Sequence, residues 1–286
     1  MKLRVGYLIS GIVTGLIILF SFILTLPDGK LHVVFCNVGQ GDAAYIRFPD
    51  GRDMVIDGGP DDKIINCLGR HMPFWDRHID LVALTHPQKD HMQGLISVFA
   101  RFDVSYFLRS DVQNTTEGYQ KLMNMVSQKN VPIKYMAQQD NVDIGSTSLL
   151  FVWPSAQQIA KAVEANVLGA SVGELNDYSL VLDLHYGTFD VLMTGDADSH
   201  VEPSYTGTKL ADSHIEVLKV PHHGSKTGMT EAFVDWVKPE LAVISVGKNS
   251  YGHPSKEAID MLQSRGSRVL RTDKEGDIEV VSDGKN

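Results

Sequence analysis

The pattern of apolar and polar positions divides the chain into one long apolar segment and a series of short apolar runs after it. The long segment, residues 5–26, carries no charged residue over 22 positions. As an α-helix at about 1.5 Å per residue it would span roughly 33 Å, which matches the hydrocarbon core of a bilayer. Because no small-x-small cleavage site ends the run, we expect residues 1–27 to be a retained transmembrane anchor and not a cleaved secretory signal.

Basic residues flank this segment and predict its orientation. Lys2 and Arg4 precede it, so the positive-inside rule places the N-terminus in the cytoplasm, although Lys30 on the other side weakens the bias. We therefore expect a single-pass protein of the cell membrane with residues 28–286 outside the cytoplasm.

The runs after residue 28 are short and separated by glycine-containing turns, which is typical of β-strands. No linker, charge block or repeat divides them, so we expect one domain. The expected strands are 31–37, 43–48, 53–57, 80–85, 142–153, 179–186, 189–194, 215–220, 241–246, 267–271 and 278–282. Helical patterns lie between them, before residue 80 and near 94–102, 117–129, 155–166, 229–237 and 255–264. This order predicts an α/β (α+β) layered domain, with two packed sheets and helices outside.

Composition narrows the class of protein. The 286 residues include 26 Lys+Arg against 35 Asp+Glu, a net charge of −9, and are 43% hydrophobic, which excludes a disordered chain. The acidic balance argues against broad electrostatic capture of nucleic acid but leaves room for a local metal site that handles phosphates. Cys36 and Cys67 would pair in an oxidising compartment, but we expect two buried free thiols.

Histidine and aspartate residues gather directly after the apolar strands. Strand ends converge on one edge of a sheet, and imidazole with carboxylate is the ligand set of Zn, Mn and Fe centres. Each motif alone is weak, but together they predict a metal site. The other histidines are expected to be ordinary core or surface residues. The candidates are His86, Gln88, Asp90 and His91 after 80–85, Asp196 after 189–194, His222 and His223 after 215–220, and His253 after 241–246.

Seven ordered motifs add a resemblance to a known family. NVGQGDA, VIDGG, THPQKDHMQG, NDYSLVL, TGD, LKVPHHGS and SVGKNSYGHPS resemble the metallo-β-lactamase domain of the ComEC competence (DNA-internalisation) family over about residues 31–282. The resemblance implies a four-layer αββα sandwich with a metal centre at one edge of the sheets, and a hydrolase acting on phosphodiesters such as DNA. The family's multi-helix channel is not found here, so we expect a stand-alone domain that is not itself a DNA pore.

The resemblance also implies roles for single residues. The family's H-x-H-x-D-H loop reads His86-Pro87-Gln88-Lys89-Asp90-His91, so Gln88 replaces a ligand histidine. Asp196 matches the carboxylate that bridges two metals, and His222 or His223 supplies a further ligand, with the choice left open. Asp90, Asp196 and His253 are the expected catalytic residues. Weak or supporting positions are Gln88, Asn176, Asp57 and Asp42, of which Asn176 stands where other branches of the superfamily have a further ligand histidine. Expected phosphate contacts are Ser225, Lys226 and Lys248.

The expected chemistry is metal-dependent hydrolysis. Two cations roughly 3.5–4 Å apart lower the pKa of a shared water molecule and neutralise charge on a phosphodiester. A neutral amide at Gln88 is a weak ligand, so we expect one or two ions, Zn or Mn. Two alternatives stay open: hydrolysis of another ester or amide, and a catalytically degraded binding or scaffold domain. The sequence does not indicate a protein partner.

Overall fold

Two seven-stranded sheets form the body of the molecule within the described residues, which are 5–23, 25–164, 175–211 and 214–285 of a computed structural model. The first sheet runs, from edge to edge, through β14 (Ile278–Ser282), β1 (Leu31–Phe35), β2 (Ala44–Arg47), β3 (Asp53–Ile56), β4 (His78–Leu84), β5 (Asp103–Arg109) and β6 (Ile133–Tyr135). The second runs through β13 (Arg268–Arg271), β12 (Leu241–Ile244), β11 (Val217–Lys219), β10 (Phe189–Met193), β9 (Val181–Tyr186), β8 (Thr147–Trp153) and β7 (Asn141–Ile144).

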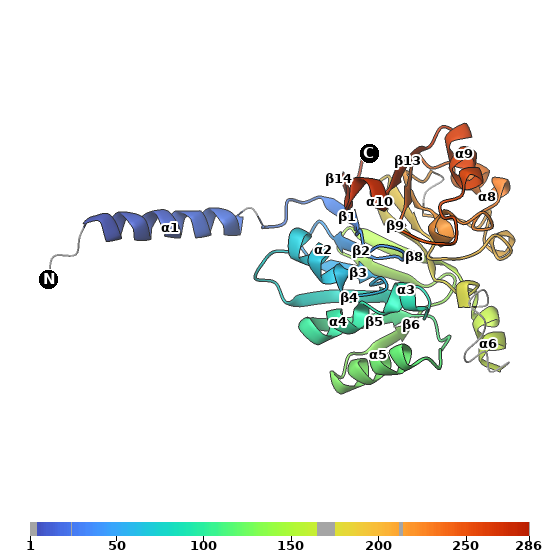
Figure 1. The fold of residues 1–286 in the computed structure, drawn as a ribbon, viewed down its shortest axis with the longest axis horizontal. Helices are drawn as coiled ribbons and strands as arrows, with labels where there is room; N and C mark the ends of the chain where they lie inside the picture. Colours follow the sequence, from blue (N-terminus) through green and yellow to red (C-terminus); the bar gives the residue numbers. More distant parts are fainter. Residues whose placement is uncertain (1–4, 24, 165–174, 212–213, 286) are drawn as a thin grey trace.

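Helices cover the outer faces of both sheets, as Figure 1 shows. Apolar residues of helices on one side share a buried cluster with the first sheet, and those of α8 and α9 share another with the second. The predicted four-layer αββα sandwich is therefore confirmed. The helices on the first sheet are α2 (Lys63–His71), α3 (Lys89–Met92), α4 (Leu95–Arg101) and α5 (Glu117–Gln128); the others are α6 (Ala156–Glu164), η1 (Glu202–Ser204), η2 (Pro221–Gly224), α8 (Glu231–Val237), α9 (Lys256–Ser264) and α10 (Thr272–Glu275).

The alternation of side chains along each strand builds these layers. Val33 and Phe35 of β1 lie in the core between the two sheets, whereas Val34 lies in the core beneath the helices. Successive side chains of a strand point to opposite faces, so one apolar run serves both cores. This explains why the strands read as continuous apolar stretches.

The short helices α3, η1, η2 and α10 were not predicted. The predicted strands and longer helices agree with the structure apart from three differences. The run 142–153 is not one strand but the hairpin of β7 and β8, which turns at Gly145 with φ of 62°. Strands β5 and β6 were not predicted, because polar residues interrupt their apolar positions. Helix α6 confirms the helix expected at 155–166 as far as residue 164; residues 165 and 166 lie outside the described part.

The two cysteines form a disulfide, so the expectation of two free thiols was wrong. Cys36 follows β1 and Cys67 lies on α2, with 5.8 Å between their Cα atoms and both side chains buried. The strand and the helix pack together in one apolar core, which brings together residues 31 positions apart. Disulfides persist in oxidising compartments.

Helix α1 (Val5–Ile23) stands away from the sandwich (Figure 1). Its residues Gly6–Ile23 have a mean hydropathy of 2.2 and none of this window is buried. The helix is long and apolar enough to cross a membrane. It ends three residues before the predicted boundary at residue 26. Lys2 and Arg4, which predict its orientation, lie outside the described residues.

A buried acid in the second half of the sandwich makes the stability of the fold depend on pH. Glu202 is fully buried and accepts a hydrogen bond from the backbone N–H of Thr230 at 2.8 Å. Burial raises the pKa of its carboxyl to about 7. The folded state therefore binds this proton more tightly than the unfolded state does, and stability falls as pH rises from about 4.5 through 7.

We expect Glu202→Gln to remove this dependence and to raise the free energy of unfolding at pH 8 by up to about 3 kcal/mol. At pH 5 the wild-type carboxyl keeps its proton, so the two proteins should differ little. Urea unfolding at both pH values measures the difference. If the free energies of unfolding of the two proteins differed equally at pH 5 and pH 8, the raised pKa of Glu202 would be contradicted.

Candidate metal centre

The carboxyl ends of three buried strands carry the polar residues of the site. Strand β4 leads into His86 and then α3, which carries Asp90 and His91. Strand β10 leads to Asp196, and β11 leads to η2, which carries His223. The sheets that hold these ends pack face to face, so residues 137 positions apart at most (86 to 223) meet at one edge.

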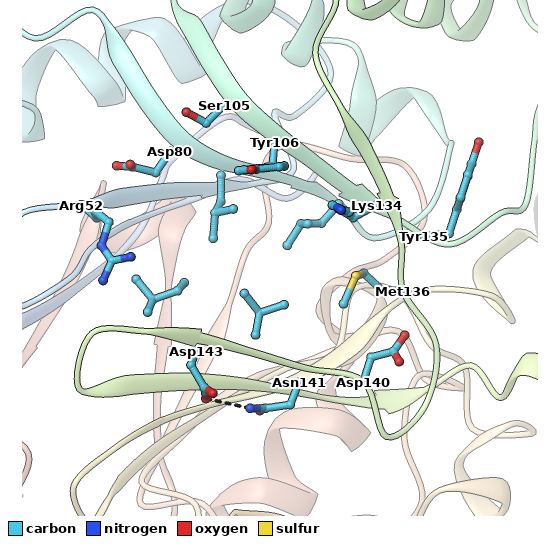
Figure 2. Close-up of a pocket in the computed structure, with 14 residues that line it drawn as sticks. Arg52, Asp80, Ser105, Tyr106, Lys134, Tyr135, Met136, Asp140, Asn141 and Asp143 are labelled. Atoms are coloured by element: carbon cyan, nitrogen blue, oxygen red, sulfur yellow. Dashed lines mark hydrogen bonds between the residues drawn. The ribbon is translucent and has the colours of Figure 1, made fainter.

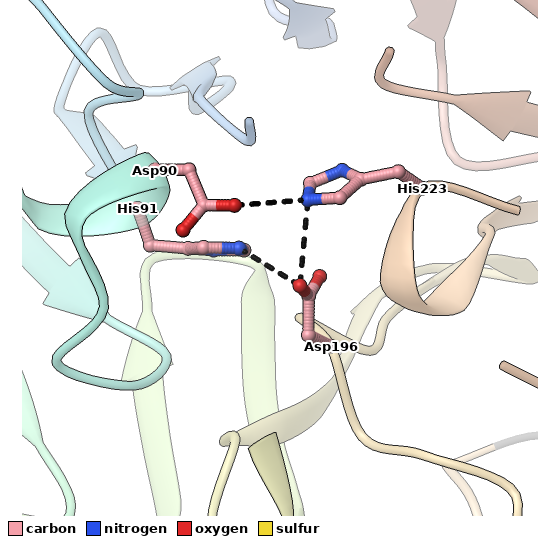
Figure 3. Close-up of side chains that lie close together, drawn as sticks. All are labelled: Asp90, His91, Asp196 and His223. Carbon is pink, nitrogen blue, oxygen red and sulfur yellow. Dashed lines mark ion pairs between the residues drawn. The ribbon is translucent and has the colours of Figure 1, made fainter. Parts of the chain in front are cut away.

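Four of the predicted ligands converge on one point, as Figure 3 shows. One ligand atom from each of Asp90, His91, Asp196 and His223 lies within 4.8 Å of the others. Oδ2 of Asp196 is 3.2 Å from Nε2 of His91 and 3.3 Å from Nε2 of His223. Nε2 of His223 is also 3.5 Å from Oδ2 of Asp90. Of the two neighbouring histidines, the structure brings His223 into this cluster.

The donor atoms of the cluster fit a divalent cation. Nε2 of His91 and Nε2 of His223 are buried and make no hydrogen bond, and neither does the buried Oδ1 of Asp196. Nε2 of His86 is buried without a partner as well. Leaving such groups unpaired in the interior is costly, and imidazole nitrogens with carboxylate oxygens are the ligands that bind Zn, Mn or Fe.

Neighbouring groups fix the orientation of both imidazoles. Asp57 contacts Nδ1 of His91 at 2.7 Å and accepts hydrogen bonds from the backbone N–H and hydroxyl of Thr85. Nδ1 of His223 lies 2.9 Å from the carbonyl oxygen of Ser245. With Nδ1 held in each ring, Nε2 points into the cluster, the arrangement that outer groups impose on metal-binding histidines.

Charge in the cluster is balanced by protons and by one lysine. Burial opposes the charged form of the imidazoles, but Asp196 with Asp57 or Asp42 raises the pKa of His91 and of His223 well above the ordinary value. Burial alone would raise the pKa of Asp196, yet His223 and His91 hold it well below its ordinary value. Without a cation, protons on the imidazoles therefore offset the carboxylates.

Lys219 is a member of the site that the sequence did not reveal. Its ammonium pairs with Asp42, donates to the carbonyl of Gly195 at 3.0 Å and lies 3.7 Å from Oδ1 of Asp196. Its side chain is only 5% exposed. Burial would raise the pKa of Asp42, but Lys219 lowers it. The one sequence feature that could have indicated its role is that this lysine lies inside the apolar run 215–220.

The half of the site around His86 contains amide side chains at positions where the family resemblance predicts imidazole ligands. The amide nitrogen of Gln88 donates to the side-chain oxygen of Asn176 at 2.6 Å. Nδ2 of Asn176 lies 3.5 Å from Nε2 of His222. His86 stays neutral, because burial and the nearby His91 lower its pKa to about 3. This half therefore offers one neutral imidazole, with two amides bonded to each other.

The backbone is strained where the site is built. Asp57, His222 and His223 have φ of 57°, 47° and 54°, in the left-handed region that favours glycine. Each such residue costs on the order of 1–3 kcal/mol, and such conformations gather at functional sites. At η2 this backbone turns the two adjacent histidine rings apart, with 69° between their planes.

A cavity of about 1180 Å³ opens over the cluster. Asp90, Asp196 and His223 line it together with His253 and Lys248. The cavity is therefore large enough for an extended substrate and carries both an imidazole and a cation beside the ligands.

Two of the expected phosphate contacts are engaged elsewhere. Lys226 is 72% exposed and pairs with Glu257 at 3.1 Å. Ser225 is buried, and its hydroxyl lies 3.3 Å from that of Thr227. Of the three residues expected to contact phosphate, Lys248 is the one that lines the cavity.

A second hollow of about 510 Å³ lies between the edges of the two sheets (Figure 2). Its wall mixes apolar residues with separate charges such as Arg52, Asp80 and Lys134. Asn141 and Asp143 on its floor are hydrogen-bonded to each other at 2.7 Å. The described metal-ligand cluster of Figure 3 is not part of this hollow, so we place the functional site at the larger cavity.

No protein-family model matches the chain. Its sequence is similar to ComE operon protein 3 of Bacillus subtilis, with 26% identity over 284 residues, and to competence protein ComA of Neisseria gonorrhoeae, with 36% identity over 259 residues. The matches cover 93% and 89% of this chain but 34% and 33% of those proteins. The chain thus spans about a third of the length of the curated relatives it matches.

Solved structures share the fold at low sequence identity. YhfI of Bacillus subtilis, a metallo-β-lactamase fold protein, superposes over 87% of this chain and 100% of its own, with TM-score 0.56 and 10% identity. Igni18, a metallo hydrolase of Ignicoccus hospitalis, covers 87% of this chain and 98% of its own, with TM-score 0.54 and 14% identity. CmlA, a diiron β-hydroxylase of Streptomyces venezuelae, covers 89% and 54%, with TM-score 0.54 and 14% identity. Hydrolysis and hydroxylation both occur on this fold, so the fold alone does not decide the reaction.

Proposed function

The chain has the metallo-β-lactamase fold and resembles the corresponding domain of competence proteins, and from this premise we propose a membrane-anchored, metal-dependent hydrolase that cleaves phosphodiester bonds in DNA. Residues 1–27 are the anchor and residues 28–286 the hydrolase domain. The observation that carries the proposal is the cluster of Asp90, His91, Asp196 and His223 beside the cavity, in which Nε2 of both imidazoles is buried without a hydrogen bond.

Asp90, His91, Asp196 and His223 would hold the cation, and His86 lies beside them. When bound, a divalent cation lowers the pKa of water and neutralises charge on phosphodiester oxygens. Asp90 has a side chain that is 33% exposed, so its carboxylate faces both the cluster and the cavity and can accept a proton from the attacking water. Burial and the neighbouring His222 lower the pKa of His253, so its neutral ring can donate a hydrogen bond to the substrate.

The charged rim of the cavity favours a phosphodiester among the substrates that this fold can serve. Lys89 and Lys248 line the cavity, and an ammonium group binds phosphate as a point charge. A neutral lactone or thioester would gain little from them. One similar protein is named competence protein ComA, and the motifs resemble a DNA-internalisation family, which supports DNA as the substrate.

One observation favours a competing function. Gln88 and Asn176 are bonded to each other in the half of the site where histidines are expected. A binding or scaffold domain that has lost catalysis would tolerate this change. Four clustered candidate ligands, two of which have a buried Nε2 without a hydrogen bond, weigh against such a loss.

The test is cleavage of single- and double-stranded DNA by the full chain in detergent, with Mn, Mg or Zn added. We expect cleavage that depends on the added metal and disappears in His223→Gln, with His214→Gln as a matched control because His214 lies on the surface and pairs with Glu216. Hydrolysis of a lactone or thioester without DNA cleavage would show that DNA is not the substrate. Metal binding without any hydrolysis would favour the scaffold.

Orientation is a separate prediction. We propose that the domain lies outside the cytoplasm, as Lys2 and Arg4 predict, and the Cys36–Cys67 disulfide supports an oxidising compartment. A reporter fused at the C-terminus should be active only when it is exported. Activity of a cytoplasm-specific reporter at the same position would show that the domain lies in the cytoplasm.

A further inference from the structure

Two aromatic side chains project from the loop that joins α2 to β4. Phe74 is 66% exposed and Trp75 is 38% exposed. Their rings contact each other edge to face, with 4.8 Å between centroids. The two adjacent exposed rings form a contiguous apolar patch, and such patches mark sites of contact with a partner or a membrane.

This loop contacts the end of the candidate membrane helix. The ring of Trp75 lies 4.8 Å from that of Phe22, which is the second-last residue of α1. The apolar window Gly6–Ile23 is about 27 Å long at 1.5 Å per residue, close to the thickness of a bilayer core. Phe22 therefore lies at the level where the hydrocarbon core meets the headgroups, and Trp75 lies at the same level. Tryptophan is enriched at that level because its ring is amphipathic.

We propose that Phe74 and Trp75 form a membrane-docking loop, which inserts into the interfacial region of the outer leaflet and holds the hydrolase domain in a fixed orientation on the bilayer. The inference rests on the anchoring of α1 proposed above. The partner is the lipid bilayer itself, because the loop is continuous with a helix long enough to cross it.

The docked loop determines where the metal centre faces. Strand β4 starts at His78, directly after the loop, and its far end leads to His86 in the site. Seven residues at about 3.3 Å each separate the two ends by roughly 20 Å. In Figure 1 the helix α3, which carries Asp90 and His91, lies at the end of the first sheet that is remote from α1. The cavity therefore opens away from the membrane, where a long polymer can reach it without contact with lipid.

The experiment uses the full chain in vesicles of phosphatidylethanolamine and phosphatidylglycerol. Both native cysteines are in the disulfide, so Phe74→Cys gives a single thiol for an environment-sensitive fluorophore. Tyr251→Cys is the matched control, because Tyr251 is a 74% exposed aromatic residue at the rim of the cavity. We expect nitroxide lipids labelled near the headgroup to quench the fluorophore at position 74 and to leave that at position 251 unquenched.

A second measurement avoids any change to Phe74. Lipids brominated near the headgroup should quench part of the native tryptophan emission, and Trp75→Phe should remove that part. Protein that floats with vesicles but shows water-exposed probes at both positions would overturn the docking loop and leave the anchor standing. Equal quenching at positions 74 and 251 would overturn the orientation. Protein that fails to float would overturn the anchor and the docking loop together.

Discussion

Asp196→Ala should lose bound metal and hydrolytic activity together, whereas His253→Ala should keep the metal and turn over more slowly. Asp196 contacts both imidazoles of the cluster through Oδ2, and its buried Oδ1 makes no hydrogen bond but lies 3.7 Å from Nζ of Lys219. Removing it leaves His91, His223 and Lys219 without their shared counter-charge. Since losing an outer partner already costs about 10–100-fold in metal affinity, losing Asp196 should cost more.

His253 differs because it lines the cavity without belonging to the cluster. Its ring lies 5.5 Å from that of His222 and its Nδ1 is buried without a partner. Its truncation should therefore lower turnover, by about 10²–10⁴-fold if the ring transfers a proton and by less if it only binds phosphate.

Metal content and DNA cleavage should be measured on the same preparations. Asp196→Asn keeps the shape of the side chain and separates loss of charge from loss of folding. Lys121→Ala, an exposed change on α5, should alter neither quantity. Cleavage at the wild-type level by Asp196→Ala would mean that the activity belongs to a contaminant or to another site, and the scaffold function would then take over.

The convergence of the candidate residues on one point was predictable because it depends on a rule of topology. Asp90, His91 and Asp196 each follow a strand that is recognisable from its apolar run, and strand ends meet at one edge. The sequence could not choose between His222 and His223, because adjacent residues have the same environment until the backbone is known. The structure distinguishes them, because Nε2 of His223 lies 3.3 Å from Oδ2 of Asp196, whereas Nε2 of His222 lies 3.5 Å from Nδ2 of Asn176.

Lys219 and the disulfide were missed for a different reason. Both depend on which face of an element a side chain occupies. Lys219 ends β11 and reaches Asp42, which lies 177 positions earlier (219 − 42). Cys36 and Cys67 meet only because α2 packs on the outer face of the first sheet. Long-range packing of this kind leaves no mark in local periodicity.

The last prediction concerns the number of ions that the site holds. In the native protein Gln88 bonds to Asn176, so the half of the site around His86 offers one imidazole and two amides. Amides are weak ligands beside imidazole, and we expect between one and two ions per chain, with strong dependence on added metal. Gln88→His should tighten the weaker site.

The double change Gln88→His and Asn176→His should tighten it further, because it replaces both partners of the amide pair and leaves neither one unpaired. A second ion bound only to the folded state raises stability by RT ln(1 + [L]/Kd), or about 2.7 kcal/mol at one hundred times Kd. The melting temperature of the double variant should therefore rise with added Mn or Zn over a range where that of the native protein has levelled off. Ser250→His, an exposed position on the rim of the same cavity but outside the amide pair, is the matched control. Native protein that already holds two ions through dialysis against a chelator would show that Gln88 does not weaken the site.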